Sequence, residues 1–319
     1  MPQVDLPIEQ LLEYQGRNPK PADFDPFWDK ALAEMNAVDA DVELQVHSID
    51  ADFAECFELR FTGVGGARVF AKYVRPAKTN GPVPCVLQFH GYGGASEQEW
   101  SNLLSWAARG YAVASLDCRG QGGKSEDVGG VKGNTQNGLI IRGLDDSPEK
   151  LYFRSVFLDT AQLAKVVASF DEVDGNRLGA MGGSQGGALT LACAALAPIK
   201  RAAPVFPFLS DYQRVWEMDL AVSAYAELKS FFRQFDPRHE RENAIFERLG
   251  YIDIQHLMPR VTGEVLLGVG LMDTVCPPST QFAAFNKIQT PKNYVLYPDF
   301  GHEGLPGFTD LIWNFMGGL

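Results

Sequence analysis

The sequence predicts an α/β fold with a mostly parallel central sheet, helices on both faces of that sheet, and antiparallel strands on its N-terminal side. Two observations lead to this prediction. Before Pro84, polar and apolar residues alternate within residues 41–75, most clearly at 57–61, which is typical of half-exposed antiparallel strands. After Pro84, short continuous apolar runs alternate with segments of helical periodicity, which is typical of buried parallel strands covered by helices.

The predicted elements follow one another in a regular order. An N-terminal arm covers about residues 1–40 and contains a short helix at 29–36 behind a cluster of prolines and aromatic residues. A capping-box pattern, Ser96 to Glu99, predicts that the next helix begins near residue 100. Strands are predicted at 85–89, 111–116, 177–181, 201–205, 264–269 and 293–297, and helices between 100 and 110, at 155–170, after 184, at 280–288 and at 308–315.

A long excursion separates the predicted strands at 201–205 and 264–269. Its residues, about sixty, show helical periodicity and no strand pattern. An insertion of this size between neighbouring strands predicts a helical cap over about 208–260, above the carboxyl edge of the sheet. We expect the whole chain, 1–319, to form one domain.

The composition excludes several classes of protein. With 45% hydrophobic residues in 319, the chain has enough apolar side chains for a large core. The net charge is −12, and both signs are scattered along the chain, which argues against nucleic acid or an anionic membrane as a partner. No apolar run of 18 residues and no secretory-signal pattern occur, so we expect a cytoplasmic location. The five cysteines are widely spaced, which predicts reduced, buried thiols rather than disulfides or a metal site.

Residues 182–186 read Gly-Gly-Ser-Gln-Gly and match the G-x-S-x-G pattern of a nucleophile elbow. The match directly follows a predicted strand and precedes a helix, so Ser184 would stand in a tight strand-to-helix turn. Glycines two residues either side of Ser184 remove the Cβ clashes of such a turn, and the helix N-terminus favours negative charge beside the hydroxyl. Ser184 is therefore the candidate nucleophile. The alternative is a glycine-rich helix start that packs closely on the sheet.

A serine nucleophile needs a histidine base, and three histidines follow Ser184 in the chain. His239 falls in the predicted cap, and His256 has the sequence surroundings of a helix-surface residue. His302 follows the last predicted strand and precedes the final helix, where the α/β-hydrolase arrangement has its histidine. His302 is the candidate base.

The acid that orients this histidine is expected after an earlier strand, because α/β-hydrolases follow the order Ser, Asp or Glu, His. Asp273 stands directly after the predicted strand at 264–269. Asp299 is the alternative, since it is close to His302 in sequence, but its loop would have to fold back on itself. The chain geometry favours Asp273.

Hydrolysis of an ester also needs donors for the oxyanion. The backbone N–H of Gln185, directly after the nucleophile, is expected to be one of them. His90-Gly91-Tyr92-Gly93-Gly94 follows the strand at 85–89 and resembles the H-G-G-G loop of esterases, with Tyr92 in place of a glycine. The Tyr92 N–H is the expected second donor, and His90 is expected to brace this loop.

These residues, taken together, resemble the carbohydrate esterase family 7 deacetylases, which contain acetyl xylan esterases and cephalosporin-C deacetylases. The resemblance extends over nearly the whole chain, because the N-terminal arm is similar to that of the family. The motifs that carry it are Tyr14-Gln15-Gly16, Arg119-Gly120-Gln121, the elbow at 182–186 and His302-Glu303.

The resemblance implies an α/β-hydrolase fold in which Ser184, Asp273 and His302 form the triad and the Tyr92 and Gln185 amides form the oxyanion hole. Arg119 and Gln121 match the family's own signature, and we expect them to shape the site. The resemblance further implies a homohexamer and small acetylated substrates such as xylooligosaccharides and cephalosporin C, with no cofactor.

Two other functions remain open at this stage. The same scaffold can serve a lipase or an aminopeptidase, because fold alone does not set the substrate. A catalytically inactive hydrolase fold acting as a binding module is the alternative from another class. Activity measured over a series of acyl chain lengths distinguishes the first alternative from an acetyl esterase. Labelling by a fluorophosphonate probe distinguishes an active enzyme from an inactive fold.

Overall fold

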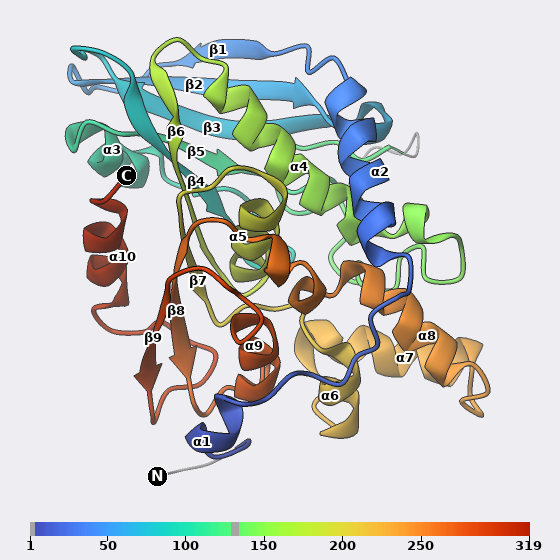
Figure 1. The fold of residues 1–319 in the computed structure, drawn as a ribbon. Coiled ribbons are helices and arrows are strands. Elements are labelled where there is room, and N and C mark those ends of the chain that lie inside the picture. The colour runs from blue at the N-terminus through green and yellow to red at the C-terminus, as the bar shows by residue number, and fades with distance from the viewer. Residues whose placement is uncertain (1–3, 129–133) are drawn as a thin grey trace.

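A nine-stranded sheet runs through the part of the chain that the computed structural model describes, residues 4–128 and 134–319 (Figure 1). Residues 1–3, part of the opening stretch used in the signal-sequence prediction, lie outside it. The strand order is β1-β2-β3-β5-β4-β6-β7-β8-β9. The strands are β1 (Glu43–His47), β2 (Ala54–Thr62), β3 (Arg68–Pro76), β4 (Val83–Phe89), β5 (Ala112–Leu116), β6 (Val173–Gly183), β7 (Arg201–Val205), β8 (Glu264–Gly270) and β9 (Lys292–Tyr297).

The sheet has an antiparallel part and a parallel part, as the sequence predicts. Strands β1, β2 and β3 pair antiparallel in chain order, and β3 pairs antiparallel with β5. From β5 through β4 to β9, all neighbours pair parallel. The carboxyl ends of the parallel strands therefore meet at one edge, which is where functional loops of an open α/β sheet gather.

The central parallel strands are mainly apolar because both of their faces are covered. In β4, Cys85, Leu87 and Phe89 contribute to a larger core, whereas Val86 points into a smaller one on the opposite face. This alternation is the period-two geometry of a strand buried on both sides. It accounts for the mainly apolar composition of β4, in which Gln88 is the polar residue.

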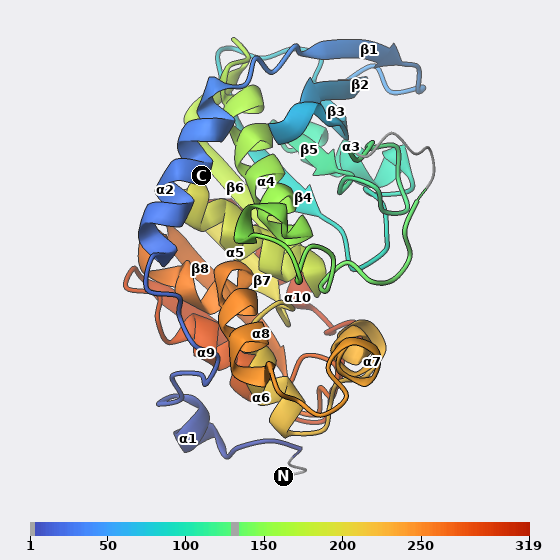
Figure 2. The ribbon, with the colours of Figure 1, turned by 90° about the vertical axis from the view of Figure 1, so that its right-hand side faces the viewer.

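Helices form a layer on each face of the sheet (Figures 1 and 2). Side chains from α2, α4, α5 and α9 fill the larger core, and those of α3 and α10 fill the smaller core. None of the helices in the described ranges combines the length and the apolar character needed to cross a membrane. The bounds are α1 (Ile8–Leu11), α2 (Phe24–Ala37), α3 (Trp100–Ala108), α4 (Tyr152–Ala168), α5 (Gln185–Leu196), α9 (Pro278–Phe285) and α10 (Phe308–Met316).

The predicted start of α2 is wrong, whereas α3 begins at Trp100 as predicted but without the predicted cap. Helix α2 begins at Phe24 rather than residue 29, because Pro26 falls in its first turn, where a missing N–H costs no hydrogen bond. The capping box before α3 does not form. The Ser96 N–H instead donates to Asp117 Oδ1 at 2.6 Å, which ties this segment to the end of β5.

The excursion between β7 and β8 carries α6 (Tyr212–Glu217), α7 (Ala226–Phe235), α8 (Glu242–Leu249) and short 3₁₀ turns. The arrowheads of β8 and β9 point toward the end of the molecule where these helices lie (Figure 1). Aromatic rings hold the helices together, with the Phe232 centroid 4.7 Å from Trp216 and 5.9 Å from Phe246.

The N-terminal arm is bound to this excursion by hydrogen bonds. The Tyr14 hydroxyl donates to Asp211 Oδ2 at 2.8 Å, and the Arg17 and Asn18 N–H groups donate to Asp211 Oδ1 at 2.9 and 2.8 Å. One carboxylate of the excursion thus accepts three bonds from the arm.

Candidate active site

Ser184 occupies the turn between the last residue of β6 and the first residue of α5. Its φ of 57° and ψ of −120° are unusual for a residue with a side chain, and such strain is typical of functional turns. Neighbouring glycines make the turn possible, because a Cβ on Gly186 would lie 2.1 Å from the Phe89 carbonyl oxygen. A Cβ on Gly182 would lie 2.6 Å from the same oxygen. The backbone of the elbow therefore lies in close contact with the end of β4.

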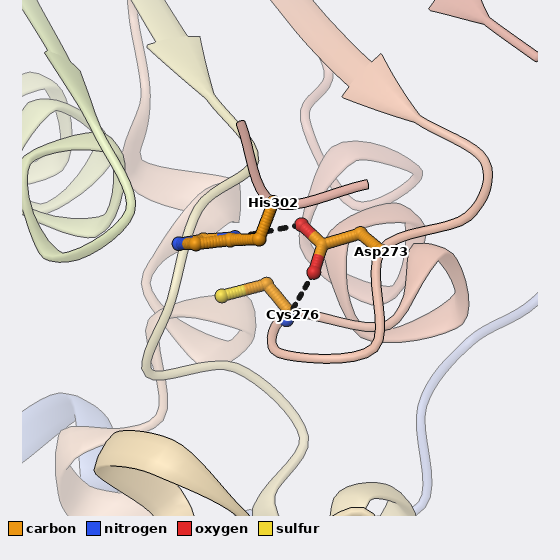
Figure 3. Close-up of side chains that lie close together, drawn as sticks. All are labelled: Asp273, Cys276 and His302. Atoms are coloured by element: carbon orange, nitrogen blue, oxygen red, sulfur yellow. Dashed lines mark hydrogen bonds and ion pairs between the residues drawn. The ribbon is translucent and has the colours of Figure 1, made fainter. Parts of the chain in front are cut away.

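His302 lies between Ser184 and Asp273. Its Nε2 is 3.0 Å from Ser184 Oγ, and its Nδ1 is 2.8 Å from Asp273 Oδ2. The three residues come from three loops at the carboxyl edge of the sheet, after β6, β8 and β9. Figure 3 shows the imidazole directed at the carboxylate of Asp273. The structure thus brings together the three side chains that the sequence singles out.

Asp273 is held so that one oxygen faces the imidazole. Its Oδ1 accepts the N–H groups of Val275 and Cys276, both at 2.8 Å, and the residue is fully buried. The alternative acid, Asp299, lies in an exposed turn after β9. No hydrogen bond joins Asp299 to His302 within the described part of the chain.

The other two histidines after Ser184 have different surroundings. His239 is exposed in the excursion, bonds to Glu242 at 2.7 Å and stacks on Phe232. His256 is buried, so the expectation of a helix-surface residue is wrong. Its ring contacts Phe24 edge-on at 5.7 Å, and burial lowers the pKa of His256 to about 3. The N-terminal arm covers this histidine, and no local pattern signals that contact.

His90 braces the loop after β4, as the sequence predicts. Its Nε2 accepts the Cys118 N–H at 3.0 Å, so Nδ1 carries the proton and donates to the Gly91 carbonyl at 2.7 Å. Burial lowers the pKa of His90 and keeps the ring neutral. In the same loop the Gly93 N–H donates to Gln121 Oε1 at 2.8 Å. The Tyr92 N–H has no hydrogen-bond partner among the described residues.

Gln185 is the first residue of α5, so its N–H has no acceptor inside the helix. Its side chain is fully buried and bonds to Gln121, with Gln121 Nε2 donating to Gln185 Oε1 at 2.9 Å. Gln121 therefore lies directly between the elbow and the loop that carries Tyr92. The Arg119 carbonyl accepts the Tyr152 hydroxyl at 2.6 Å.

Cys276 is a neighbour of the site that sequence reasoning did not single out. It lies three residues after Asp273 in the same loop, and this closeness in sequence to the predicted acid could have identified it as a neighbour of the site. Figure 3 shows its side chain alongside the His302 imidazole. Burial and the Asp273 charge raise the pKa of the Cys276 thiol well above its usual range, while a hydrogen bond with Ser184 lowers it.

One group of side chains could in principle hold a metal ion. A carboxylate oxygen of Asp273, a ring nitrogen of His302 and the Cys276 sulfur lie within 4.8 Å of one another. Both carboxylate oxygens already accept hydrogen bonds, and the raised thiol pKa disfavours the thiolate that metals prefer. The donor set fits a hydrogen-bonded triad better than a metal centre.

Comparison with known proteins decides the family. The family model described as acetyl xylan esterase (AXE1) matches residues 1–319. The chain belongs to the acetyl xylan esterase family. Within it, the acetyl esterase Axe7A of Xylanibacter ruminicola is 27% identical over 312 residues, which are 95% of this chain and 68% of that protein.

Solved structures agree with the family assignment. The crystal structure of acetyl xylan esterase 1 from Thermoanaerobacterium sp. is 55% identical, with a TM-score of 0.94 over 98% of each chain. The acetyl xylan esterase from Paenibacillus sp. R4 is 35% identical, with a TM-score of 0.92 over 98% of this chain and 99% of that one. The α/β-hydrolase fold is thereby confirmed, and the chain is a serine acetyl esterase. The lipase, aminopeptidase and inactive-module alternatives are not favoured.

Proposed function

We propose that Ser184, Asp273 and His302 are the catalytic triad of this acetyl esterase. The observation that carries the proposal is the unbroken line of hydrogen bonds from Asp273 Oδ2 to His302 Nδ1 and from His302 Nε2 to Ser184 Oγ, at 2.8 and 3.0 Å. Such a line lets the imidazole accept the serine proton while the carboxylate orients the ring and stabilises its charged form.

In the first half of the reaction, Ser184 Oγ forms a bond to the acetyl carbonyl carbon and its proton passes to His302 Nε2. The Tyr92 and Gln185 N–H groups stabilise the negative charge on the carbonyl oxygen and so form the oxyanion hole. Both are free of other backbone acceptors in the described chain. The bond between the acetyl carbon and the alcohol oxygen of the substrate then breaks, and the His302 proton moves to that oxygen.

In the second half, a water molecule attacks the acetyl carbon of the acetyl-serine ester. His302 Nε2 takes a proton from that water, the bond from Ser184 Oγ to carbon breaks, and the proton returns to Ser184. The products are acetate and the free enzyme. These proton transfers use only side chains of this chain, which supports the expectation that no cofactor is needed.

Gln121 and Arg119 shape the site without touching the reacting atoms in this proposal. The Gln121 side chain bonds to both the Gly93 N–H and Gln185, so it sets the spacing of the two proposed oxyanion donors. Arg119 supports Gln121 through Tyr152, whose Oη accepts from Gln121 Nε2 at 3.1 Å.

The substrates we propose are small acetylated molecules, namely acetylated xylooligosaccharides and cephalosporin C. The names of the relatives support the first, and the family resemblance of the sequence supports the second. We further propose a cytoplasmic homohexamer, with residues 208–260 as a cap on a single domain. The cytoplasmic location is supported by five cysteines that are all free and buried.

The triad is tested with Ser184→Ala and, as a matched control, Ser230→Ala on the exposed surface of α7. Ser184→Ala is expected to abolish turnover of p-nitrophenyl acetate and labelling by a fluorophosphonate, with unchanged thermal stability. Ser230→Ala should retain both. Wild-type turnover in Ser184→Ala would refute the proposal.

Substrate class is tested by comparing acetylated xylooligosaccharides, cephalosporin C and simple acetates, together with p-nitrophenyl esters from acetyl to octanoyl. We expect activity to fall as the acyl chain lengthens. Activity that rises toward octanoyl would contradict the acetyl preference. Light scattering of the purified protein tests the hexamer.

A further inference from the structure

A buried carboxylate of the excursion contacts the loop that carries the proposed oxyanion donor. Glu227 lies in the first turn of α7 and is 7% exposed. Its Oε1 accepts a hydrogen bond from the Tyr92 hydroxyl, 135 residues earlier in the chain. Neither the sequence motifs nor the proposed triad involve this residue.

The second oxygen of Glu227 binds another segment near the site. Oε2 accepts the Ile140 N–H at 2.8 Å and the Ile141 N–H at 3.3 Å, and the Leu139 N–H in turn donates to Tyr92 Oη at 3.3 Å. One carboxylate therefore joins three elements: α7, the connection between β5 and α4, and the loop after β4. Helix α7 also packs through Leu228, Phe231 and Phe232 into the larger core, so the carboxylate adds directed hydrogen bonds to that apolar packing.

The side chain of Tyr92 is also held by an aromatic contact. Its ring meets Phe208 edge-on at 5.7 Å, and the Phe208 N–H donates to the Ser184 carbonyl at 3.0 Å. Tyr92 is thus held between Glu227 and a residue bonded to the nucleophile elbow. Since the Tyr92 backbone N–H is attached to the same residue, fixing the side chain also limits where that N–H can point.

We propose that Glu227 is a positioning residue for acetyl transfer, which fixes Tyr92 through its hydroxyl and thereby aims the Tyr92 N–H at the oxyanion. This inference rests on the proposed function, in which the Tyr92 N–H is an oxyanion donor. It adds that the excursion takes part in catalysis by holding a backbone donor from a distance.

The electrostatics of Glu227 support a functional reason for its position. Burial raises the pKa of Glu227, and hydrogen bonds from the backbone N–H groups of residues 138–141 only partly offset that rise. Because a raised pKa disfavours the ionised form in the folded state, the stability that Glu227 contributes is greatest below the usual pKa of a glutamate and falls as the pH rises. Carboxylates kept at such a disadvantage are found preferentially at functional sites.

Asp236 offers a matched control for a purely structural role. It follows the last residue of the same helix, is also buried, and its two oxygens accept the N–H groups of Glu240 and Arg241, each at 2.9 Å. No hydrogen bond joins it to Tyr92 in the described part of the chain. Removing Asp236 therefore deletes a buried carboxylate with two hydrogen bonds from the end of α7, and breaks no bond to the loop that carries Tyr92.

The experiment compares Glu227→Ala, Glu227→Gln and Asp236→Ala in the full-length enzyme with p-nitrophenyl acetate. We expect Glu227→Ala to lower kcat by about 10- to 100-fold, the loss typical of a misplaced catalytic group, with KM changed by less than ~3-fold. Glu227→Gln keeps one acceptor oxygen and should recover part of the rate. Asp236→Ala should keep kcat within ~2-fold of wild type.

Two further measurements separate positioning from general loosening. The Ki of 1,1,1-trifluoroacetone, a ketone that serine converts to a tetrahedral oxyanion, should rise in Glu227→Ala in parallel with the loss of kcat/KM. In a Tyr92→Phe background, where the hydroxyl is absent, Glu227→Ala should change kcat by less than ~3-fold, because a residue that acts through this hydroxyl has lost its partner.

The outcomes distinguish this inference from the proposed function. If wild-type Ser184 is not labelled by fluorophosphonate, the proposed function fails. If Ser184 is labelled but Glu227→Ala and Asp236→Ala have the same kcat, or the loss is as large in Tyr92→Phe as in wild type, the inference alone is overturned. Should Glu227→Ala not fold, the same comparisons apply to Glu227→Gln.

Discussion

Arg119 and Asp159 form a two-point ion pair inside the protein. Arg119 Nε lies 2.7 Å from Asp159 Oδ2, Arg119 Nη2 lies 2.6 Å from Oδ1, and both residues are 1% exposed. The pair joins the loop after β5 to the middle of α4. The carbonyl of Arg119 also accepts the Tyr152 hydroxyl, and Tyr152 contacts Gln121. The ion pair therefore supports the side chains that hold the loop carrying Tyr92.

We predict that Arg119→Met lowers the free energy of unfolding by about 3–5 kcal/mol, because Asp159 is left buried without its partner. The double variant Arg119→Met, Asp159→Leu should recover most of that loss. Arg238→Met removes an exposed ion pair with Glu240 and is the control, with an expected cost below about 1 kcal/mol. Urea denaturation measures all three, and a mild effect of Arg119→Met alone would contradict the prediction.

Asp273→Asn should lower kcat for p-nitrophenyl acetate by about 10⁴-fold. An amide at this position no longer favours the His302 tautomer that accepts the serine proton. Asp299→Asn, in the exposed turn before His302, should leave kcat unchanged. Equal losses in the two variants would mean that the acid has been wrongly chosen.

Gly186→Ala should destabilise the enzyme, because the new Cβ would lie 2.1 Å from the Phe89 carbonyl oxygen, which belongs to a central strand. We expect a loss of about 2 kcal/mol or more in the free energy of unfolding. Gly304→Ala is the matched control, since a Cβ there meets no atom within 4 Å. The two variants are compared by urea denaturation, and equal unfolding energies would refute this account of the elbow.

Asp253 and His256 give opposite dependences of stability on pH. Burial and the nearby Asp211 charge raise the pKa of Asp253 to about 7. Its protonation favours the folded state, so the stability it contributes is present in full below about pH 4 and is lost as the pH rises to about 7. The lowered pKa of His256, about 3, has the opposite consequence, because stability is lost as the pH falls below about 6.5.

Between about pH 4 and 6.5 the effects of Asp253 and His256 on the slope of stability against pH cancel. Substituting one residue at a time should reveal the slope due to the other. Asp253→Asn should make the enzyme lose stability on acidification, relative to wild type, by about 1 kcal/mol per pH unit. His256→Gln should change the pH dependence in the other direction. Urea denaturation at pH 5 and pH 7 measures both slopes, and slopes parallel to that of wild type would contradict the assigned pKa shifts.

Local patterns in the sequence were enough to predict the α/β class and the succession of strands and helices along the chain. Strand β7 begins and ends where the apolar run at 201–205 predicts, because burial on both faces leaves a direct trace in composition. Ser184, Asp273 and His302 were identifiable for a related reason: each follows a strand, and parallel strands bring their carboxyl ends to one edge. Chain order therefore carries spatial information about these three side chains.

Other features depended on the tertiary structure. The contact of Glu227 with Tyr92, the pairing of Arg119 with Asp159 and the burial of His256 join groups that are far apart in the chain. Periodicity reports which face of an element is buried, but it does not report which polar group will meet another once the elements pack. A buried carboxylate and an exposed one look alike in sequence, because only the folded chain decides which donors surround them and how much water is excluded.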